Sequence, residues 1–273
     1  MHMILTPCGK CLQCRIGRTA EWTIRLLHEK TCHEESCFIT LTYDEDNLPA
    51  NGTLVKSDLQ KFFKRLRKLI YPKKIKYFAC GEYGPETLRP HYHAIIFGWE
   101  PKEVYKSVGQ RKSSVELQQT WSFGNHDFGF VEADSCKYVA SYIEGKYSGE
   151  MADIVYKKNI APFSLKSLGL GKDYLMKNAD KIRENLCVTY RGKEVGLPRY
   201  YCNKLDLTEE EKRELRQRVI KKSKVYYDYY ESRKEVDLVS MKKMENVLYA
   251  KVKSNKYKES VEKHKKNLWG KDL

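Results

Sequence analysis

Two strand-like segments joined by a short loop constrain the fold of this chain more than any other part of its sequence. Residues 75–82 alternate between apolar and polar side chains, and an apolar run continues from His91 to Phe97. Two strands joined by so short a loop, here residues 83–90, lie side by side and antiparallel. We therefore expect an antiparallel strand pair in this part of the chain.

The same strand pair carries a candidate metal site. Successive side chains of a strand point to opposite faces, so His91 and His93 project from one face. Glu82 ends the first strand and can face both histidines across the ladder. Two neutral imidazoles and one carboxylate leave coordination positions open for water or substrate, and this mixed nitrogen and oxygen set suits Mn or Mg as well as Zn. The alternative is a surface strand with two unrelated histidines.

The charge balance favours a nucleic-acid partner. The 273 residues include 51 Lys and Arg against 36 Asp and Glu, which gives a net charge of +15, and 20 tyrosines. Basic side chains release phosphate counterions, and aromatic rings stack on bases. The alternatives are a basic protein without such a partner and a merely solvated helix face. The candidate DNA contacts are Lys61, Lys64, Arg65, Lys68 and Arg89.

The nine cysteines favour ligand or buried-thiol roles over disulfides, because their number is odd and the N-terminal residues lack an export signal. Cys8, Cys11 and Cys14 have the C-x2-C-x2-C spacing of a soft-metal site. An iron–sulfur site lacks its closing Cys-Pro, since Arg18 stands there. Structural zinc and three reduced cysteines in a packed loop both remain open. Candidate fourth zinc ligands are Cys32, Cys37, His28 and His33.

A helix is predicted from Asp134 or Ser135 to a stop at Gly145. Tyr138 and Tyr142 are four residues apart within it and therefore share one helix face. Taken alone, such a pair is also typical of two core rings. Other predicted elements are helices at 19–30 with a Thr19 cap, from Ser57 or Asp58 to about 70, and near 114–121, strands at 37–43 and near 126–131, and a hairpin at 190–198.

Taken together, these motifs resemble the HUH endonucleases of rolling-circle replication. The likeness extends to the replication initiators of the Microviridae, the small single-stranded DNA phages, and especially their gokushovirus branch. Five motifs occur in the family's order, and the likeness covers roughly residues 7–203. The matching segments are Pro7–Arg15, Phe38–Asp44, Gly81–Gly84, Arg89–His93 and Tyr138–Tyr142, with Leu197–Tyr201 as a later addition.

The resemblance implies a fold class and a set of roles. The expected fold is α+β, a ferredoxin-like HUH core with the histidine strand near the centre of an antiparallel sheet flanked by helices. By position, His91 and His93 match the metal ligands and Glu82 matches the third ligand less firmly. Tyr138 and Tyr142 match the nucleophiles. Lys146 matches a lysine that often follows them, whereas Ser141 departs from the Lys or Gly often found inside this motif.

The implied function is metal-dependent nicking and rejoining of origin DNA through a 5′-phosphotyrosine link, with Mg or Mn as cofactor. The implied partners are single-stranded or supercoiled origin DNA and a host replication helicase or polymerase, in the host bacterial cytoplasm. The longest apolar runs are far too short to span a membrane. Competing hypotheses are a non-catalytic DNA- or RNA-binding protein on the same fold, an HUH relaxase or transposase, and a zinc-stabilised scaffold.

Composition divides the chain near residue 205. Residues 1–205 contain the endonuclease-like motifs and the cysteine cluster. From Thr208 onward the sequence becomes highly charged with a sparse apolar stripe, and it predicts a long helix to about residue 254. We therefore expect an HUH domain at 1–205 and a charged, helical C-terminal extension at 206–273.

Overall fold

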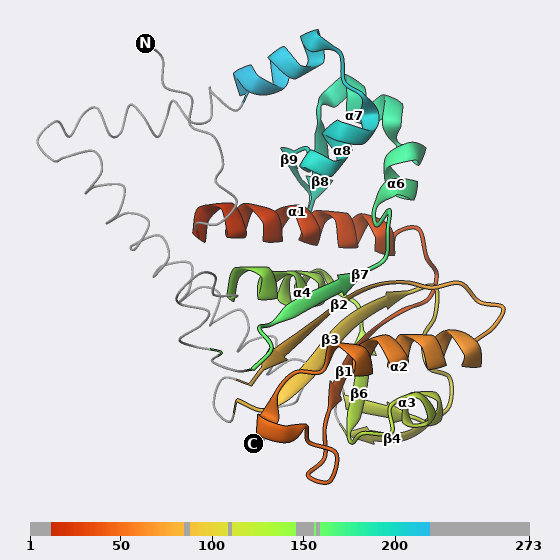
Figure 1. The fold of residues 1–273 in the computed structure, drawn as a ribbon. Coiled ribbons are helices and arrows are strands. Elements are labelled where there is room, and N and C mark those ends of the chain that lie inside the picture. Colours follow the sequence, from red (N-terminus) through yellow and green to blue (C-terminus); the bar gives the residue numbers. More distant parts are fainter. Residues whose placement is uncertain (1–11, 85–87, 109–110, 146–155, 157–158, 219–273) are drawn as a thin grey trace, which may run out of the picture. The chain divides into compact units, whose positions relative to one another are not determined.

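The computed structural model describes residues 12–84, 88–108, 111–145, 156 and 159–218 (Figure 1). The chain divides into two compact units between Gly171 and Lys172. Each unit is considered by itself. No helix among the described residues combines the length and the apolar character that a membrane crossing requires.

The first unit is built on a seven-stranded sheet in which every pairing is antiparallel. Its spatial order is β4-β5-β6-β1-β3-β2-β7, so the histidine strand β3 lies between β1 and β2. The strands are β1 (Ser36–Thr42), β2 (Lys76–Tyr83), β3 (Pro90–Phe97), β4 (Val104–Val108), β5 (Arg111–Ser114), β6 (His126–Phe130) and β7 (Phe163–Lys166).

The four central strands, β6-β1-β3-β2, have the split βαββαβ connectivity of ferredoxin-like folds. Helix α2 (Lys56–Leu69) joins β1 to β2, and α3 (Val115–Thr120) lies between β3 and β6 in the chain. The α+β prediction, with an antiparallel sheet flanked by helices, is therefore confirmed. The short edge strands β4, β5 and β7 are absent from the sequence prediction.

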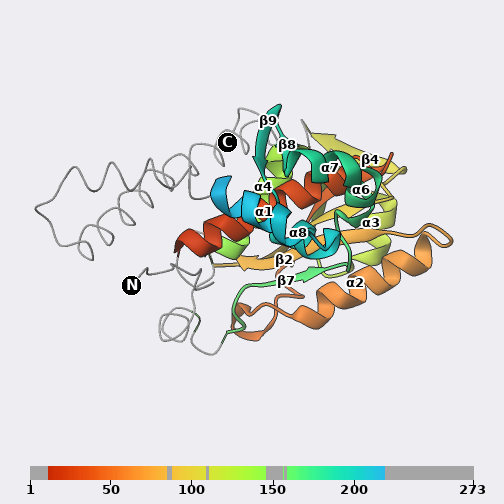
Figure 2. The same cartoon turned by 90° about the horizontal axis from the view of Figure 1, so that it is seen from above.

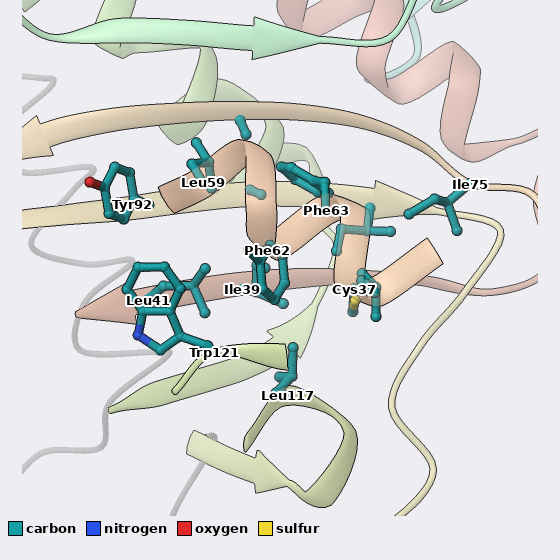
Figure 3. Close-up of a cluster of buried hydrophobic side chains, with 14 of the residues drawn as sticks. Cys37, Ile39, Leu41, Leu59, Phe62, Phe63, Ile75, Tyr92, Leu117 and Trp121 are labelled. Atoms are coloured by element: carbon teal, nitrogen blue, oxygen red, sulfur yellow. The ribbon is translucent and has the colours of Figure 1, made fainter. Parts of the chain in front are cut away.

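Helices α2 and α3 share one core with a face of this sheet (Figure 3). The apolar residues of α2 recur at helical spacing and are buried, as the sequence predicts. They pack against alternate residues of β1 and β3, such as Ile39, Leu41 and Tyr92, and against Leu117 and Trp121. Because strand side chains alternate, this packing directs Thr40, His91 and His93 to the opposite face.

Helices α1 (Leu12–Lys30) and α4 (Ala133–Gly145) contribute to a second core on that opposite face (Figures 1 and 2). Leu26, Val139 and Ala140 pack there with Phe38 and Phe78 of the sheet. Helix α1 begins earlier than the predicted start at Thr19. The Thr19 side chain is buried and donates a hydrogen bond to the Ala140 carbonyl at 3.2 Å, so it joins α1 to α4 instead of capping α1.

A short 3₁₀ turn (Ala50–Gly52) precedes α2, and a glycine ends the histidine strand. Gly98 has a positive φ of 87°, and a Cβ there would lie 2.7 Å from the Lys74 carbonyl oxygen. Only glycine combines this conformation with so close a backbone approach. The turn keeps the C-terminal end of β3 beside the start of β2.

The second unit is small and mainly helical. It contains α6 (Lys172–Lys177), α7 (Ala179–Asn185), α8 (Arg199–Leu205) and the predicted hairpin of β8 (Cys187–Tyr190) and β9 (Lys193–Gly196). A further helix follows at 209–218. Thr208 and Glu211 exchange backbone–side-chain hydrogen bonds of 2.6 and 3.2 Å, a capping box that starts this helix.

The predicted continuation of that helix to residue 254 lies outside the described residues. The division into domains at 1–205 and 206–273 stays a prediction.

Candidate metal centre and tyrosine pair

Strand register brings the candidate ligands together. Glu82 of β2 is directly opposite His91 of β3, and His93 follows two residues later on the same face. Glu82 Oε1 lies 2.7 Å from His91 Nε2 and 3.1 Å from His93 Nε2. One ligand atom from each residue lies within 4.8 Å of the other two. Two imidazole nitrogens and a carboxylate oxygen therefore converge on one point, as the sequence predicts.

The outer nitrogens of the two imidazoles have partners of their own. His91 Nδ1 lies 3.0 Å from the Arg89 carbonyl oxygen, which only accepts hydrogen bonds, so Nδ1 carries the proton. His93 Nδ1 lies 3.0 Å from the buried Thr40 hydroxyl, which can accept in the same way. This arrangement leaves both Nε2 lone pairs directed toward Glu82. Outer contacts of this kind orient histidine ligands in metal sites.

The charge of the cluster fits a divalent cation. Burial acts to raise the pKa of Glu82, but contacts with His91 and His93 more than offset it, and the pKa lies below its ordinary value. With Nδ1 protonated, each neutral imidazole directs a lone pair at the same carboxylate, which is repulsive unless a positive charge lies between them. A cation on Glu82, His91 and His93 removes that repulsion, so these three residues fit a metal ion.

Both predicted tyrosines lie against the histidine pair. The ring of Tyr142 stacks on that of His93 with centroids 5.6 Å apart and planes 5° apart. The ring of Tyr138 meets His93 edge-on at 5.3 Å, and the two tyrosine rings are 5.1 Å apart. Val139 and Ala140 of the same helix are buried in the core. Packing of α4 on the sheet therefore directs both phenols toward the metal side.

Burial also affects the acidity of the phenols. It raises the pKa of Tyr142 well above its ordinary value of 10, and the nearby Glu82 carboxylate and Tyr138 raise it further. A tyrosine in this state is protonated at neutral pH and is a weak nucleophile. Reaction at Tyr142 therefore requires local positive charge or a proton acceptor.

Ser141, which departs from the family pattern, lies between the two tyrosines in α4. Its side chain is buried, and its hydroxyl donates a hydrogen bond of 2.6 Å to the Tyr138 carbonyl oxygen. Back-bonding of this kind lets a serine satisfy its hydroxyl inside a helix. The contact gives this position a local structural role.

Sequence reasoning missed Thr40. The available signal was the alternation of residues 36–42, which directs Phe38 and Thr40 to the face opposite Ile39 and Leu41. Register then sets Thr40 opposite His93, and the Phe38 ring stacks on that of His93 at 5.5 Å. The hydroxyl and the ring together fix the orientation of this imidazole.

We expect Thr40→Val to weaken divalent metal binding about 10–100-fold, the range typical when an outer partner of a metal ligand is lost. Valine keeps the shape of threonine but cannot accept the proton of His93 Nδ1. Isothermal titration with Mn²⁺ measures the effect. Thr42→Val is the matched control, because the Thr42 hydroxyl donates to the Asn125 carbonyl at 3.3 Å. Equal affinities for the two variants would contradict this role of Thr40.

The candidate DNA contacts lie in different surroundings. Lys61, Lys64 and Lys68 are exposed on α2, which covers the other face of the sheet from the histidine pair. Arg65 Nε donates to the Thr120 carbonyl at 2.7 Å, which joins α2 to α3. Arg89 pairs with Glu45 at 2.5 Å and donates to the Tyr43 carbonyl at 2.9 Å. None of these contacts involves the tyrosine pair, and DNA binding by the five residues stays a prediction.

The cysteine cluster is described only in part, since Cys8 and Cys11 lie outside the described residues. Cys14 lies in the first turn of α1. The candidate fourth ligand His28 lies 14 residues later on the same helix, about 21 Å along its axis. Cys32, His33 and Cys37 follow the end of α1. The helix thus separates Cys14 from His28, and structural zinc stays a prediction. Lys146 also lies outside the described residues.

Comparison with known proteins gives related chains. Residues 36–147 match a family model described as replication-associated protein of the ORF2 type, a range that includes both histidines and both tyrosines. The chain is 32% identical over 257 residues to replication-associated protein ORF2 of Spiroplasma virus 4, covering 82% of this chain and 79% of that protein.

It is also 32% identical to VP4 of Bdellovibrio phage phiMH2K and to ORF4 of Chlamydia phage 1, both replication-associated proteins. Each match covers 71% of this chain, but only 65% of VP4 and 52% of ORF4. The chain thus spans less than two thirds of the length of these two relatives. No solved structure matches.

Proposed function

Because the chain belongs to the family of phage replication-associated proteins, we propose that it is a replication initiator that nicks and rejoins origin DNA. A single observation carries this proposal: two tyrosine rings and three convergent metal-ligand side chains meet around His93. A nucleophile beside a cation site is the arrangement that phosphodiester transfer requires.

Glu82, His91 and His93 hold a divalent cation, Mg²⁺ or Mn²⁺, in this proposal. When bound, the cation neutralises charge that develops on the scissile phosphate and favours ionisation of a nearby phenol. The Arg89 carbonyl and Thr40 hold the two imidazoles in the ligating orientation. The sheet itself fixes the spacing of the ligands, since all three lie on neighbouring strands.

The tyrosines supply the covalent step. The phenol oxygen of Tyr138 or Tyr142 forms a bond to phosphorus, and the bond from phosphorus to the 3′ oxygen breaks. The phenol loses one proton and the departing 3′ oxygen gains one, so the products are a 5′-phosphotyrosine and a free 3′-hydroxyl. The covalent link keeps the energy of the phosphodiester, and rejoining therefore needs no nucleotide cofactor.

Two adjacent tyrosines permit a second cut before the first link is resolved. While one tyrosine holds the 5′ end, the other attacks the regenerated origin, and the new 3′-hydroxyl attacks the first link. This alternation releases unit-length circles. Lys146, which follows α4, would stabilise the phosphate or a phenolate. Host replication helicase or polymerase and the host bacterial cytoplasm belong to the same proposal.

The direct test is formation of a covalent protein–DNA adduct. Purified protein is incubated with Mn²⁺ and labelled single-stranded origin DNA, and the products are separated under denaturing conditions. We expect a labelled band at the size of the protein that EDTA abolishes. Binding without any adduct would contradict the proposal and would favour a non-catalytic nucleic-acid-binding protein on the same fold.

A further inference from the structure

A second group of basic side chains lies on the metal side of the sheet, away from the tyrosines. It combines α1 with the edge strand β7, which the figures draw beside β2 (Figures 1 and 2). Arg25 lies over one face of the Trp22 ring at 4.0 Å, and Lys166 Nζ lies 5.0 Å from the centroid of the same ring. Arg18 precedes Trp22 by four residues and therefore lies on the same helix face.

Lys166 differs from other lysines of this unit in its ionic partners. It is exposed, and no carboxylate among the described residues forms an ion pair with it. Other lysines each have a glutamate, such as Lys76 with Glu29 at 2.8 Å and Lys73 with Glu35 at 2.6 Å.

Burial lowers the pKa of Lys166 below its ordinary value, and the charges of Arg25 and Arg18 lower it further. An anion bound here would relieve that repulsion.

The group also has a defined position relative to the candidate metal centre. Lys166 is directly opposite Phe78 in the sheet, and the Trp22 ring lies 5.1 Å from that of Phe78. Phe78 and Glu82 share one face of β2, four residues and about 13 Å apart. The rise of one nucleotide is about 3.4 Å in B-DNA, so a phosphate bound at Lys166 is not the scissile one.

We propose that Arg18 and Lys166, beside Trp22, bind a phosphate of the single-stranded DNA a few nucleotides from the scissile bond. This inference rests on the proposed function and adds a binding site to it. Arg25 supports the site, since its Nε and Nη2 both donate to the Leu170 carbonyl, at 3.1 and 2.9 Å. The half-buried indole supplies an apolar wall against which a sugar or base packs.

The test measures DNA binding apart from chemistry. Full-length protein carrying Tyr138→Phe/Tyr142→Phe is titrated, in EDTA, against a fluorescein-labelled single-stranded oligonucleotide of mixed sequence, and fluorescence anisotropy is followed at several salt concentrations. Adding Arg18→Gln/Lys166→Gln should weaken binding about tenfold. It should also reduce the slope of log K against log salt by about 1.4, since each phosphate contact contributes about 0.7 on single strands.

Lys56→Gln/Lys74→Gln is the matched control, because it removes the same charge from exposed residues outside this group. Lys166→Arg keeps the charge and should restore most of the affinity. The inference is overturned if the Arg18/Lys166 variant binds with the same affinity and salt slope as the control.

Adduct formation in the wild-type tyrosine background separates the two proposals. An Arg18→Gln/Lys166→Gln variant that forms the adduct fully at saturating DNA, but requires more DNA to do so, supports both. Binding equal to the control, together with a normal adduct, removes this site and leaves the proposed function intact.

Discussion

Replacing both Tyr138 and Tyr142 by phenylalanine should abolish the covalent protein–DNA adduct. Each substitution removes a single oxygen atom, and the aromatic packing against His93 at 5.3 and 5.6 Å is kept. With neither phenol present, no side chain of the pair can attack phosphorus. Loss of a nucleophile costs on the order of 10⁴-fold or more in rate. Denaturing gel analysis of labelled DNA measures both the adduct and the nicked strand.

The single variants divide the reaction into two parts. Tyr138→Phe and Tyr142→Phe each leave one nucleophile, so each should still form some adduct. Release of unit-length circles from a supercoiled substrate needs both phenols and should be lost in either variant. The ratio of adducts formed by the two single variants then identifies the first nucleophile.

Tyr105→Phe is the matched control, because Tyr105 also contacts a histidine, His126, at 6.2 Å but lies away from the metal face. It should keep full adduct formation. A normal adduct in the double variant would show that the nucleophile lies elsewhere and would remove the basis of the proposed chemistry.

Much of the central fold could be predicted because it depends on local patterns. The alternation at 75–82 and 91–97 and the short loop between them define an antiparallel pair, and Glu82 therefore lies opposite His91. The helical spacing of Leu59, Phe62 and Leu66 defines α2 in the same way. In these segments, periodicity, loop length and burial all favour one arrangement.

The missed features depend on contacts between distant segments. Thr40 acquires its role only because β1 pairs with β3 in one register, and residues 36–42 by themselves do not reveal their partner strand. Thr19 has the chemistry of a helix cap, but its hydroxyl meets Ala140, 121 residues away. The edge strand β7 is short and partly polar, and it becomes a strand because β2 offers an unpaired edge. Tertiary packing overrides local propensity in each case.

Removing the two imidazoles should abolish metal binding at the candidate site. In His91→Gln/His93→Gln only Glu82 remains of the three converging ligands, and a single carboxylate binds divalent ions weakly. The readout is independent of activity, since a ligand that binds only the folded state stabilises it by RT ln(1 + [L]/Kd). At 100 times Kd, Mn²⁺ should raise the unfolding free energy of the wild type by about 2.7 kcal/mol.

The double variant should lose this metal-induced gain almost entirely, and its adduct formation should fall with it. Urea unfolding with and without Mn²⁺ measures the gain as a difference within each protein, so any intrinsic destabilisation by the substitutions cancels. His33→Gln is the matched control, because His33 Nε2 also contacts a glutamate, Glu29, at 2.7 Å, but outside the cluster. A full Mn²⁺ effect in the double variant would mean that the ion binds elsewhere. In that case the convergence of Glu82, His91 and His93 would be a hydrogen-bonded cluster with at least one protonated imidazole, and the tyrosines would lack their neighbouring cation.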